Sequence, residues 1–95
     1  MSQIGTNLDE LYEVIVGRRE NPVEGSYTNY LFDKGLDKIL KKMGEETTEV
    51  VIAAKNGSHG EIVYEMADLL YHLSVLMVAQ GITWQELDDE LKRRR

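Results

Sequence analysis

The sequence contains no cysteine and a single proline, Pro22, among its 95 residues. The absence of cysteine excludes a disulfide framework, a thiolate metal site and a cysteine nucleophile. With only one proline, long helices can run without interruption. No uninterrupted apolar run reaches the roughly 18 residues that a membrane span needs, and the start, MSQIGTNLDELYEVI, lacks the basic-then-apolar layout of a signal peptide. We therefore expect a cytoplasmic protein with no membrane partner.

The composition is that of one small globular domain, which we expect to cover residues 1–95. Hydrophobic residues make up 42% and charged residues 29% of the chain. The formal net charge of −6 argues against general nucleic-acid binding. The basic tail at residues 92–95 is better explained as a helix C-terminus, where cations complement the helix dipole. We expect no nucleic-acid partner.

Hydrophobic spacing predicts helices along the chain, and no segment shows the sustained alternation of a strand. A first helix is expected at about residues 7–16, with Thr6 as its N-cap and Gly17 as its stop. Residues 18–25 contain the proline and a glycine and are expected to form a loop.

The next stretch and the C-terminal stretch both begin with a hydroxyl residue. Ser26 or Thr28 could cap a short helix that ends at Phe32, or this stretch could remain a loop over a site. Near the C-terminus, Thr83 and Glu86 form a capping box that opens a last helix, WQELDDELKRRR.

Two long helices are expected between these segments. The first covers residues 36–55 and is ended by the Asn-Gly pair that follows. Ser58 and Glu61 form a capping box for the second, which runs to Gln80. Because the connection is only a few residues long, the two helices should form an antiparallel αα-hairpin. The sequence therefore predicts an all-α protein built on this hairpin.

The first long helix carries three acids at residues 45–49. At about 100° per residue, Glu46 falls inside the apolar stripe, Glu49 lies at its edge, and Glu45 points further toward solvent. A glutamate on the core side of a helix is costly unless it is paired or bound to metal. The stripe itself is expected to consist of Leu36, Ile39, Leu40, Met43, Val50 and Ala54.

The second long helix carries Glu65 and Asp68, which share one flank with Glu61 and His72. Its stripe is expected to consist of Ile62, Met66, Leu69, Leu70, Leu73, Leu76 and Met77, and much of the remaining surface is apolar too. A helix that is apolar nearly all round is buried on all sides. One small domain can hardly bury it alone, so we expect a homodimer that completes the bundle.

Acids on two facing helices would repel one another, and a divalent cation removes that conflict. Ligands that offer only oxygen suit Mg²⁺, Mn²⁺ or Ca²⁺, whereas zinc prefers histidine and cysteine. Lys42 on the same flank suggests a polyphosphate beside the metal. Taken singly, either acidic pair is more often a solvated helix face; the two pairs together favour a metal site.

The motif EExxE at residues 45–49, followed by ExxD at residues 65–68, resembles the signature of the all-α NTP pyrophosphohydrolase (MazG-type) superfamily. Two longer stretches, SYTNYLFDKGLDKILKKMGEETTEVVIAAKNG and EMADLLYHLSVLM, are similar to the core of one branch, the phosphoribosyl-ATP pyrophosphohydrolases of histidine biosynthesis. This resemblance covers almost the whole chain, although the first 20 residues match only loosely.

The resemblance implies a helical bundle assembled as a dimer or larger, and Mg²⁺-dependent hydrolysis of phosphoribosyl-ATP to phosphoribosyl-AMP and pyrophosphate, with Mn²⁺ as a possible substitute. The implied metal ligands are Glu46, Glu49, Glu65 and Asp68. The implied catalytic acids are Glu45, Glu46 and Glu49, without an assignment of the base. Lys38, Lys41 and Lys42 would face the substrate phosphates, and Ser26, Tyr27 and Thr28 would lie near the substrate.

Two alternatives stay open at this point. One is a house-cleaning (d)NTP pyrophosphohydrolase of the same superfamily, against which the context around the EExxE motif argues. The other is a dimeric helical adaptor without enzymatic activity, in which the acids serve no metal.

Overall fold

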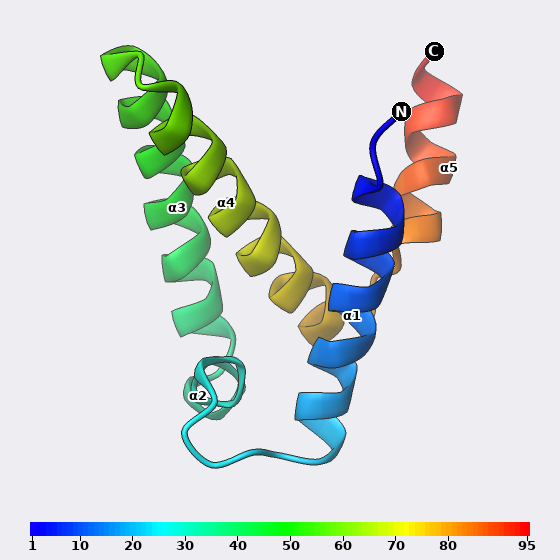
Figure 1. Cartoon of the computed structure of the whole chain (residues 1–95). Coiled ribbons are helices and arrows are strands. Elements are labelled where there is room, and N and C mark those ends of the chain that lie inside the picture. The colour runs from blue at the N-terminus through cyan, green and yellow to red at the C-terminus, as the bar shows by residue number, and fades with distance from the viewer.

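The computed structural model describes all 95 residues and contains helices but no strands (Figure 1). In chain order the helices are α1 (Ile4–Glu20), α2 (Tyr27–Lys34), α3 (Leu36–Asn56), α4 (His59–Gln80) and α5 (Trp84–Arg94). The all-α class predicted from the sequence is confirmed.

Helices α3 and α4 form the predicted antiparallel hairpin and share the largest interhelical interface in the chain. Gly57 ends α3 with φ of 78°, and its backbone N–H donates to the carbonyl of Ala53 at 3.1 Å. A positive φ of this kind favours glycine, which has no Cβ to clash. The tight turn holds the two long helices side by side (Figure 1).

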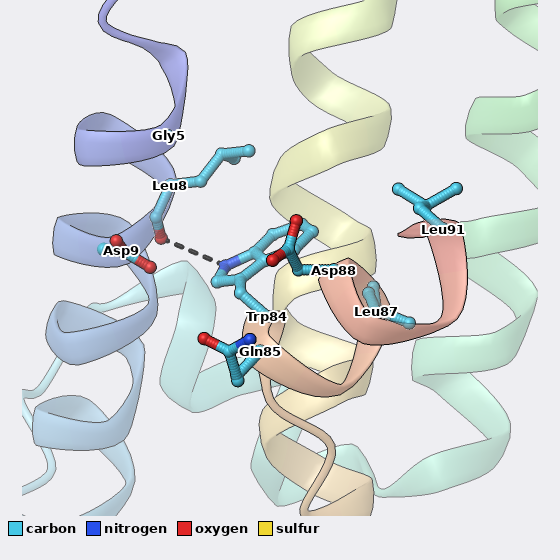
Figure 2. A pocket seen from close by; sticks show the side chains of 8 residues that line it. All are labelled: Gly5, Leu8, Asp9, Trp84, Gln85, Leu87, Asp88 and Leu91. Atoms are coloured by element: carbon cyan, nitrogen blue, oxygen red, sulfur yellow. Dashed lines mark hydrogen bonds between the residues drawn. The ribbon is translucent and has the colours of Figure 1, made fainter. Parts of the chain in front are cut away.

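Helix α5 returns beside α1, and two hydrogen bonds tie the segments together. The indole Nε1–H of Trp84 donates to the carbonyl of Leu8 at 3.2 Å, and the hydroxyl of Tyr12 donates to the carbonyl of Ile82 at 2.9 Å. A hollow of about 420 Å³ lies between these helices (Figure 2), lined by Gly5, Leu8, Asp9, Trp84, Gln85, Leu87, Asp88 and Leu91.

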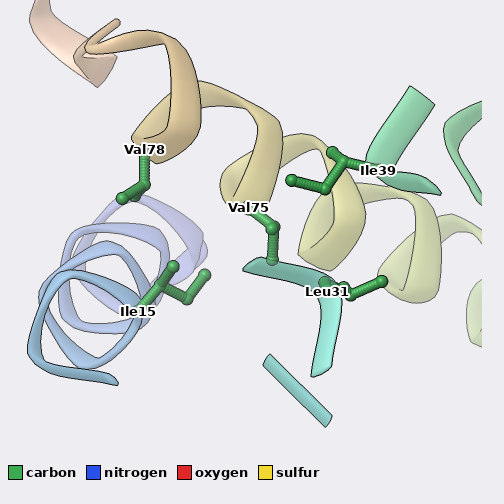
Figure 3. Packing of buried hydrophobic residues seen from close by; sticks show 5 residues of the cluster. All are labelled: Ile15, Leu31, Ile39, Val75 and Val78. Atoms are coloured by element: carbon green, nitrogen blue, oxygen red, sulfur yellow. The ribbon is translucent and has the colours of Figure 1, made fainter. Parts of the chain in front are cut away.

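The hydrophobic core lies where α1, α2, α3 and α4 meet (Figure 3). It consists of five buried side chains, one or two from each of these helices: Ile15, Leu31, Ile39, Val75 and Val78. Helix α2 is short, but Leu31 has no exposed surface at all. The core therefore depends on α2 as much as on the long helices.

The end of α1 differs from the prediction, because the helix continues through Gly17 to Glu20. A glycine inside a helix costs about 1 kcal/mol relative to alanine. Tertiary contacts hold the extra turn: Arg19 Nη1 donates to the carbonyl of Val78 at 2.8 Å, and the carbonyl of Arg18 accepts from the Asn29 side chain at 2.6 Å. The predicted loop at residues 18–25 therefore begins only after Glu20.

Some of the predicted helix starts are confirmed and others are wrong. Ser26 caps α2 by accepting from the backbone N–H three residues later, and α2 runs two residues beyond Phe32. The capping box of Thr83 and Glu86 is present. Ser58 occupies the N-cap position of α4 without a capping hydrogen bond, and Thr6 lies inside α1 rather than at its start.

The apolar stripe predicted on α3 is only partly buried. Ile39 is buried, but Leu36 and Leu40 are 43% and 47% exposed. Ala53 is buried in place of Ala54. Buried residues on α3 recur every seven positions, at 39, 46 and 53, which is the repeat of a helix facing one neighbouring helix. Only this seam, and not the wider stripe, is covered within the chain.

Helix α4 is buried along its C-terminal half, where α1 and α2 cover it, and is open along its N-terminal half. Its buried residues all lie between His72 and Val78. Val63 and Met66 are 55% and 49% exposed. The hairpin end of α3 and α4 extends away from the other helices (Figure 1).

By length and composition α4 is the one helix long and apolar enough to cross a membrane. The core helix of a globular protein passes the same test, so this indication is weak. The helix packs against both α3 and α1 and carries two of the clustered acids described below.

The role of α2 in the core can be tested with Leu31→Ala, which removes a side chain without exposed surface. Leu/Ile to Ala changes in cores cost about 2–5 kcal/mol. We expect a loss of that size in the free energy of unfolding, measured by urea denaturation. Leu91→Ala, at a residue 64% exposed, is the matched control and should change stability by less than about 0.5 kcal/mol. Equal losses in the two variants would contradict this description of the core.

Candidate metal centre

Four carboxylates converge where α3 and α4 face each other. Glu46 and Glu49 lie one turn apart on α3, and Glu65 and Asp68 lie one turn apart on α4. Because the two helices are antiparallel neighbours, one oxygen from each carboxylate lies within 4.8 Å of the others. These are the four residues that the family resemblance implied as metal ligands. Their metal binding remains a prediction.

The cluster contains carboxylate oxygens that no protein group satisfies. Glu46 is 3% exposed, and its Oε2 has no hydrogen-bond partner; the same holds for the buried Oε2 of Glu65. Leaving a buried polar group unsatisfied costs about 1–3 kcal/mol, and more for a charged one. Oxygen-only donor sets are those that Mg²⁺ and Mn²⁺ prefer. The cluster therefore fits a hard divalent cation, which would coordinate the orphaned oxygens.

Crowding alters the protonation of the cluster. Burial is the main cause that raises the pKa of Glu46 from 4.5 to about 7, and the carboxyl groups of Asp68 and Glu49 add to the effect. The pKa of Glu65 is also raised, chiefly by the neighbouring carboxyl group of Glu49. Without a cation, the cluster therefore retains protons near neutral pH. A divalent cation would have to displace them.

Lys42 is the cation that borders the cluster. Its Nζ lies 3.2 Å from Oε2 of Glu45 and 3.7 Å from Oε1 of Glu46. The hydrogen bond with Glu45 is the main cause that raises the pKa of Lys42, so this side chain stays charged. Glu45 lies outside the group of four converging carboxylates. Its carboxylate is therefore free for a role other than direct coordination.

The other two lysines that were expected to face the phosphates do not contact the acids. Lys38 Nζ lies 5.9 Å from the ring centroid of Tyr30. Lys41 is exposed and borders a hollow that Glu45 and Glu49 also line, but it makes no ion pair with either. Only Lys42 makes ion pairs with the EExxE acids in this structure.

Of the three residues at the start of α2 that were expected near the substrate, only Tyr27 presents an exposed side chain beside the cluster. Ser26 is engaged as the helix cap, and Thr28 is buried with its hydroxyl bonded to that of Tyr71. The Tyr27 hydroxyl lies 3.0 Å from Nε2 of His72, while its ring is part of a side chain 43% exposed. Burial raises the pKa of Tyr27, so its phenol stays neutral.

His72 also belongs to this centre. One of its ring nitrogens lies within 4.8 Å of a carboxylate oxygen of both Glu46 and Asp68. Its place beside Asp68 follows from the i, i+4 spacing on α4. Its contact with Tyr27 joins residues 45 positions apart in the chain, and no local pattern in the sequence indicates such a contact.

The site is a shallow groove. A hollow of about 140 Å³ adjoins the cluster and is lined by Glu49, Ile52, Ala53, Asn56, Glu61 and Glu65. None of the clustered acids lines the larger hollow of Figure 2, which lies between α1 and α5. The arrangement can hold a cation and present it to a polyphosphate, but it does not enclose a substrate.

Comparison with known proteins extends this description. Residues 8–95 match the family model described as phosphoribosyl-ATP pyrophosphohydrolase. The phosphoribosyl-ATP pyrophosphatase of Limosilactobacillus fermentum is 60% identical over 88 residues, which cover 93% of this chain and 83% of that protein. The phosphoribosyl-ATP pyrophosphatase of Lactiplantibacillus plantarum is 57% identical over the same shares.

A bifunctional relative is also similar. The histidine biosynthesis bifunctional protein HisIE of Caldanaerobacter subterraneus is 67% identical over 87 residues, which are 92% of this chain. The match spans only 42% of that protein. The similarity therefore concerns one part of the bifunctional relative.

The raised pKa of Glu46 predicts how stability depends on pH. The folded protein retains this proton up to about pH 7, whereas the unfolded chain loses it near the ordinary pKa of a glutamate, about 4.3. Because the folded state binds the proton more tightly, the metal-free protein should lose stability as pH rises from about 4 to 7 and should change little above that. Thermal unfolding in EDTA, followed by circular dichroism, measures this loss.

Glu46→Gln removes the titrating group and serves as the comparison. At pH 8 this variant should melt higher than the metal-free wild type by about 5 °C or more, since 1 kcal/mol shifts the Tm of such a domain by about 4–8 °C. At about pH 4, below the pKa of the unfolded glutamate, the two proteins should melt at similar temperatures. Parallel pH profiles would show that Glu46 is not the group responsible.

Proposed function

The chain belongs to the phosphoribosyl-ATP pyrophosphohydrolase family, and on that premise we propose that residues 1–95 form a single domain that hydrolyses phosphoribosyl-ATP to phosphoribosyl-AMP and pyrophosphate with Mg²⁺. The observation that carries this proposal is the convergence of four carboxylates, two of which have an orphaned buried oxygen. The proposed step is the second of histidine biosynthesis. Mn²⁺ would fit the same oxygen ligands.

The charge of the site supports a metal-dependent reaction. A polyphosphate would be repelled by Glu46, Glu49, Glu65 and Asp68 without a cation between them. When bound, Mg²⁺ neutralises charge on the phosphates and on the leaving pyrophosphate and polarises a coordinated water. Mg²⁺ usually completes its coordination with waters and substrate phosphates, and the open groove leaves room for both.

The residues around the cluster have separate proposed roles in binding the phosphates and activating the water. Lys42, held by Glu45 and Glu46, places a positive charge where substrate phosphates would lie. Glu45 lies outside the converging group, so its carboxylate can orient the attacking water or accept its proton. Attack at the α-phosphorus would release the β and γ phosphates together as pyrophosphate.

We also propose that the protein acts as a homodimer whose interface covers the open half of the hairpin. Val51 and Ile52 on α3, and Val63 and Met66 on α4, are each about half exposed or more. Val63 and Met66 lie on one face of α4, three residues apart. A second copy would bury this face and could deepen the groove beside the acids.

Substrate choice tests the proposed activity directly. Pyrophosphate release should be faster with phosphoribosyl-ATP than with any member of a dNTP panel, and it should require Mg²⁺ or Mn²⁺. Preference for a dNTP would support a house-cleaning nucleotide pyrophosphohydrolase instead. If no nucleotide gives pyrophosphate, the alternative of a helical adaptor without enzymatic activity would be favoured.

Single amide substitutions test the metal ligands. Asp68→Asn and Glu49→Gln should each lower kcat/KM by about 10²–10³-fold, the loss typical of removing one group that stabilises transition-state charge. Circular dichroism should show an unchanged helical fold. Glu10→Gln, at an exposed acid on α1, is the matched control and should retain full activity. Full activity in Asp68→Asn would remove this residue from the metal site.

Charge placed on the open face of α4 tests the proposed dimer. The double variant Val63→Glu/Met66→Glu should sediment as a monomer, since two like charges would face their copies across a two-fold interface. Wild type and the control Gln80→Glu, at the other end of α4, should sediment as dimers. A dimeric double variant would place the interface elsewhere.

A further inference from the structure

His72 is a buried polar residue whose two ring nitrogens both have partners at the edge of the metal centre. The residue is 3% exposed. Its Nδ1 lies 2.9 Å from the backbone carbonyl oxygen of Asp68 and 3.4 Å from that residue's Oδ1. Its Nε2 lies 3.0 Å from the hydroxyl of Tyr27. One imidazole therefore joins a proposed metal ligand on α4 to an exposed tyrosine on α2.

The partners decide where the proton of the neutral ring resides. A carbonyl oxygen can only accept, so Nδ1 must carry the hydrogen that is donated to Asp68. Nε2 is then an acceptor, and the Tyr27 hydroxyl donates to it. The proton of this hydroxyl is thereby committed to His72. The Tyr27 oxygen keeps its lone pairs for a hydrogen-bond donor outside the ring.

Aromatic packing fixes the orientation of this unit. The rings of Tyr27 and Tyr71 meet the His72 ring nearly edge-on, with centroid distances of 5.7 and 5.0 Å and interplanar angles of 76° and 86°. Tyr71 is itself anchored, because its hydroxyl is bonded to that of Thr28. The imidazole therefore has little freedom to rotate away from its two partners.

We propose that His72 is a positioning residue with two separable effects. Through Nδ1, which is bonded to the Asp68 backbone carbonyl and lies 3.4 Å from the Asp68 Oδ1, it fixes the turn of α4 that carries this carboxylate to the metal, and through Nε2 it holds Tyr27 for the substrate. The inference rests on the proposed function, since it assumes that Asp68 binds a cation and that phosphoribosyl-ATP lies beside Tyr27. Residues that hydrogen-bond a metal-ligating group typically alter metal affinity or activity by about 10–100-fold when they are replaced.

The substrate can supply the hydrogen-bond donor from which the Tyr27 oxygen would accept. A hydroxyl whose proton points to His72 cannot donate to a phosphate oxygen, but it can accept from a ribose hydroxyl of the nucleotide. The ring of Tyr27 also stacks on that of Tyr30, with centroids 6.0 Å apart, which gives an exposed aromatic surface beside this oxygen. The proposed contact of Tyr27 is therefore with the sugar and not with the triphosphate.

Two amide substitutions separate the two effects. In His72→Asn the amide N–H can replace Nδ1–H toward Asp68 but cannot reach Tyr27. In His72→Gln the longer side chain can reach Tyr27 but withdraws the donor from Asp68. Tyr27→Phe removes only the hydroxyl, and Ser74→Ala, which removes a buried hydroxyl bonded to the Leu70 carbonyl on the same helix, controls for general disturbance of α4.

Two measurements read the effects independently. Calorimetric titration of substrate-free protein with Mn²⁺ should give a Kd about 10–100-fold weaker in His72→Gln, and a Kd within about threefold of wild type in the other three variants. The KM for phosphoribosyl-ATP should rise severalfold in His72→Asn and in Tyr27→Phe. The double variant of these two should be no worse than either single, because both remove the same contact.

Unchanged Mn²⁺ affinity in His72→Gln together with unchanged KM in Tyr27→Phe would overturn the inference and reduce His72 to a packing residue. If the KM increases of His72→Asn and Tyr27→Phe instead multiply in the double variant, the two residues act independently, and the proposed link between them is wrong. If His72→Gln does not fold, Tyr27→Phe still tests the substrate arm by itself. Wild-type protein that neither binds Mn²⁺ nor hydrolyses phosphoribosyl-ATP would instead defeat the proposed function, and this inference with it.

Discussion

The burial of the Glu46 carboxylate among three other acids is the constraint on which the rest of this structure depends. Glu46 occupies the central position of the seam that α3 presents to the bundle, seven residues from Ile39 and seven from Ala53, a place where an apolar side chain would normally lie. Lys42 is the only cation within ion-pair distance of the cluster, 3.7 Å from Glu46. One positive charge cannot balance four carboxylates, so either protons or a metal ion must. Because the pKa of Glu46 is about 7, a metal ion would replace the Glu46 proton near neutral pH.

The site and the core are two parts of one packed surface. Along α4 a single line of side chains passes from Asp68 through His72 to Val75, at spacings of four and three residues. It thus changes from carboxylate to imidazole to apolar core within two turns. The acids stand on long helices and not on loops, and the helices are fixed by a tight turn at Gly57 and by the core beneath. Sites built on such rigid elements hold their geometry more closely than sites on loops.

Much of this arrangement could be predicted because it depends on spacing within one helix. The i, i+3 acids, the hydrophobic period and the short link at residues 57–58 were sufficient to predict the hairpin and the position of Glu46. What could not be predicted depends on contacts between distant segments. Gly17 is a good helix stop by itself, but Arg19 bonds to a carbonyl 59 residues away and holds another turn. Lys38 was expected to face the substrate phosphates together with Lys42, yet its ammonium lies over the ring of Tyr30.

Stability, metal binding and association should therefore be coupled in this protein. Only seven apolar residues are buried in the chain, a small core for 95 residues, and the acid cluster opposes folding when its carboxylates are ionised. A ligand that binds only the folded state stabilises it by mass action. The proposed cation would link α3 to α4 through their carboxylates, and the proposed second copy would cover the open half of the same hairpin. Both would stabilise the part of the hairpin that the single chain stabilises least. The acids that destabilise the metal-free fold would then make its stability depend on the ion that the reaction requires.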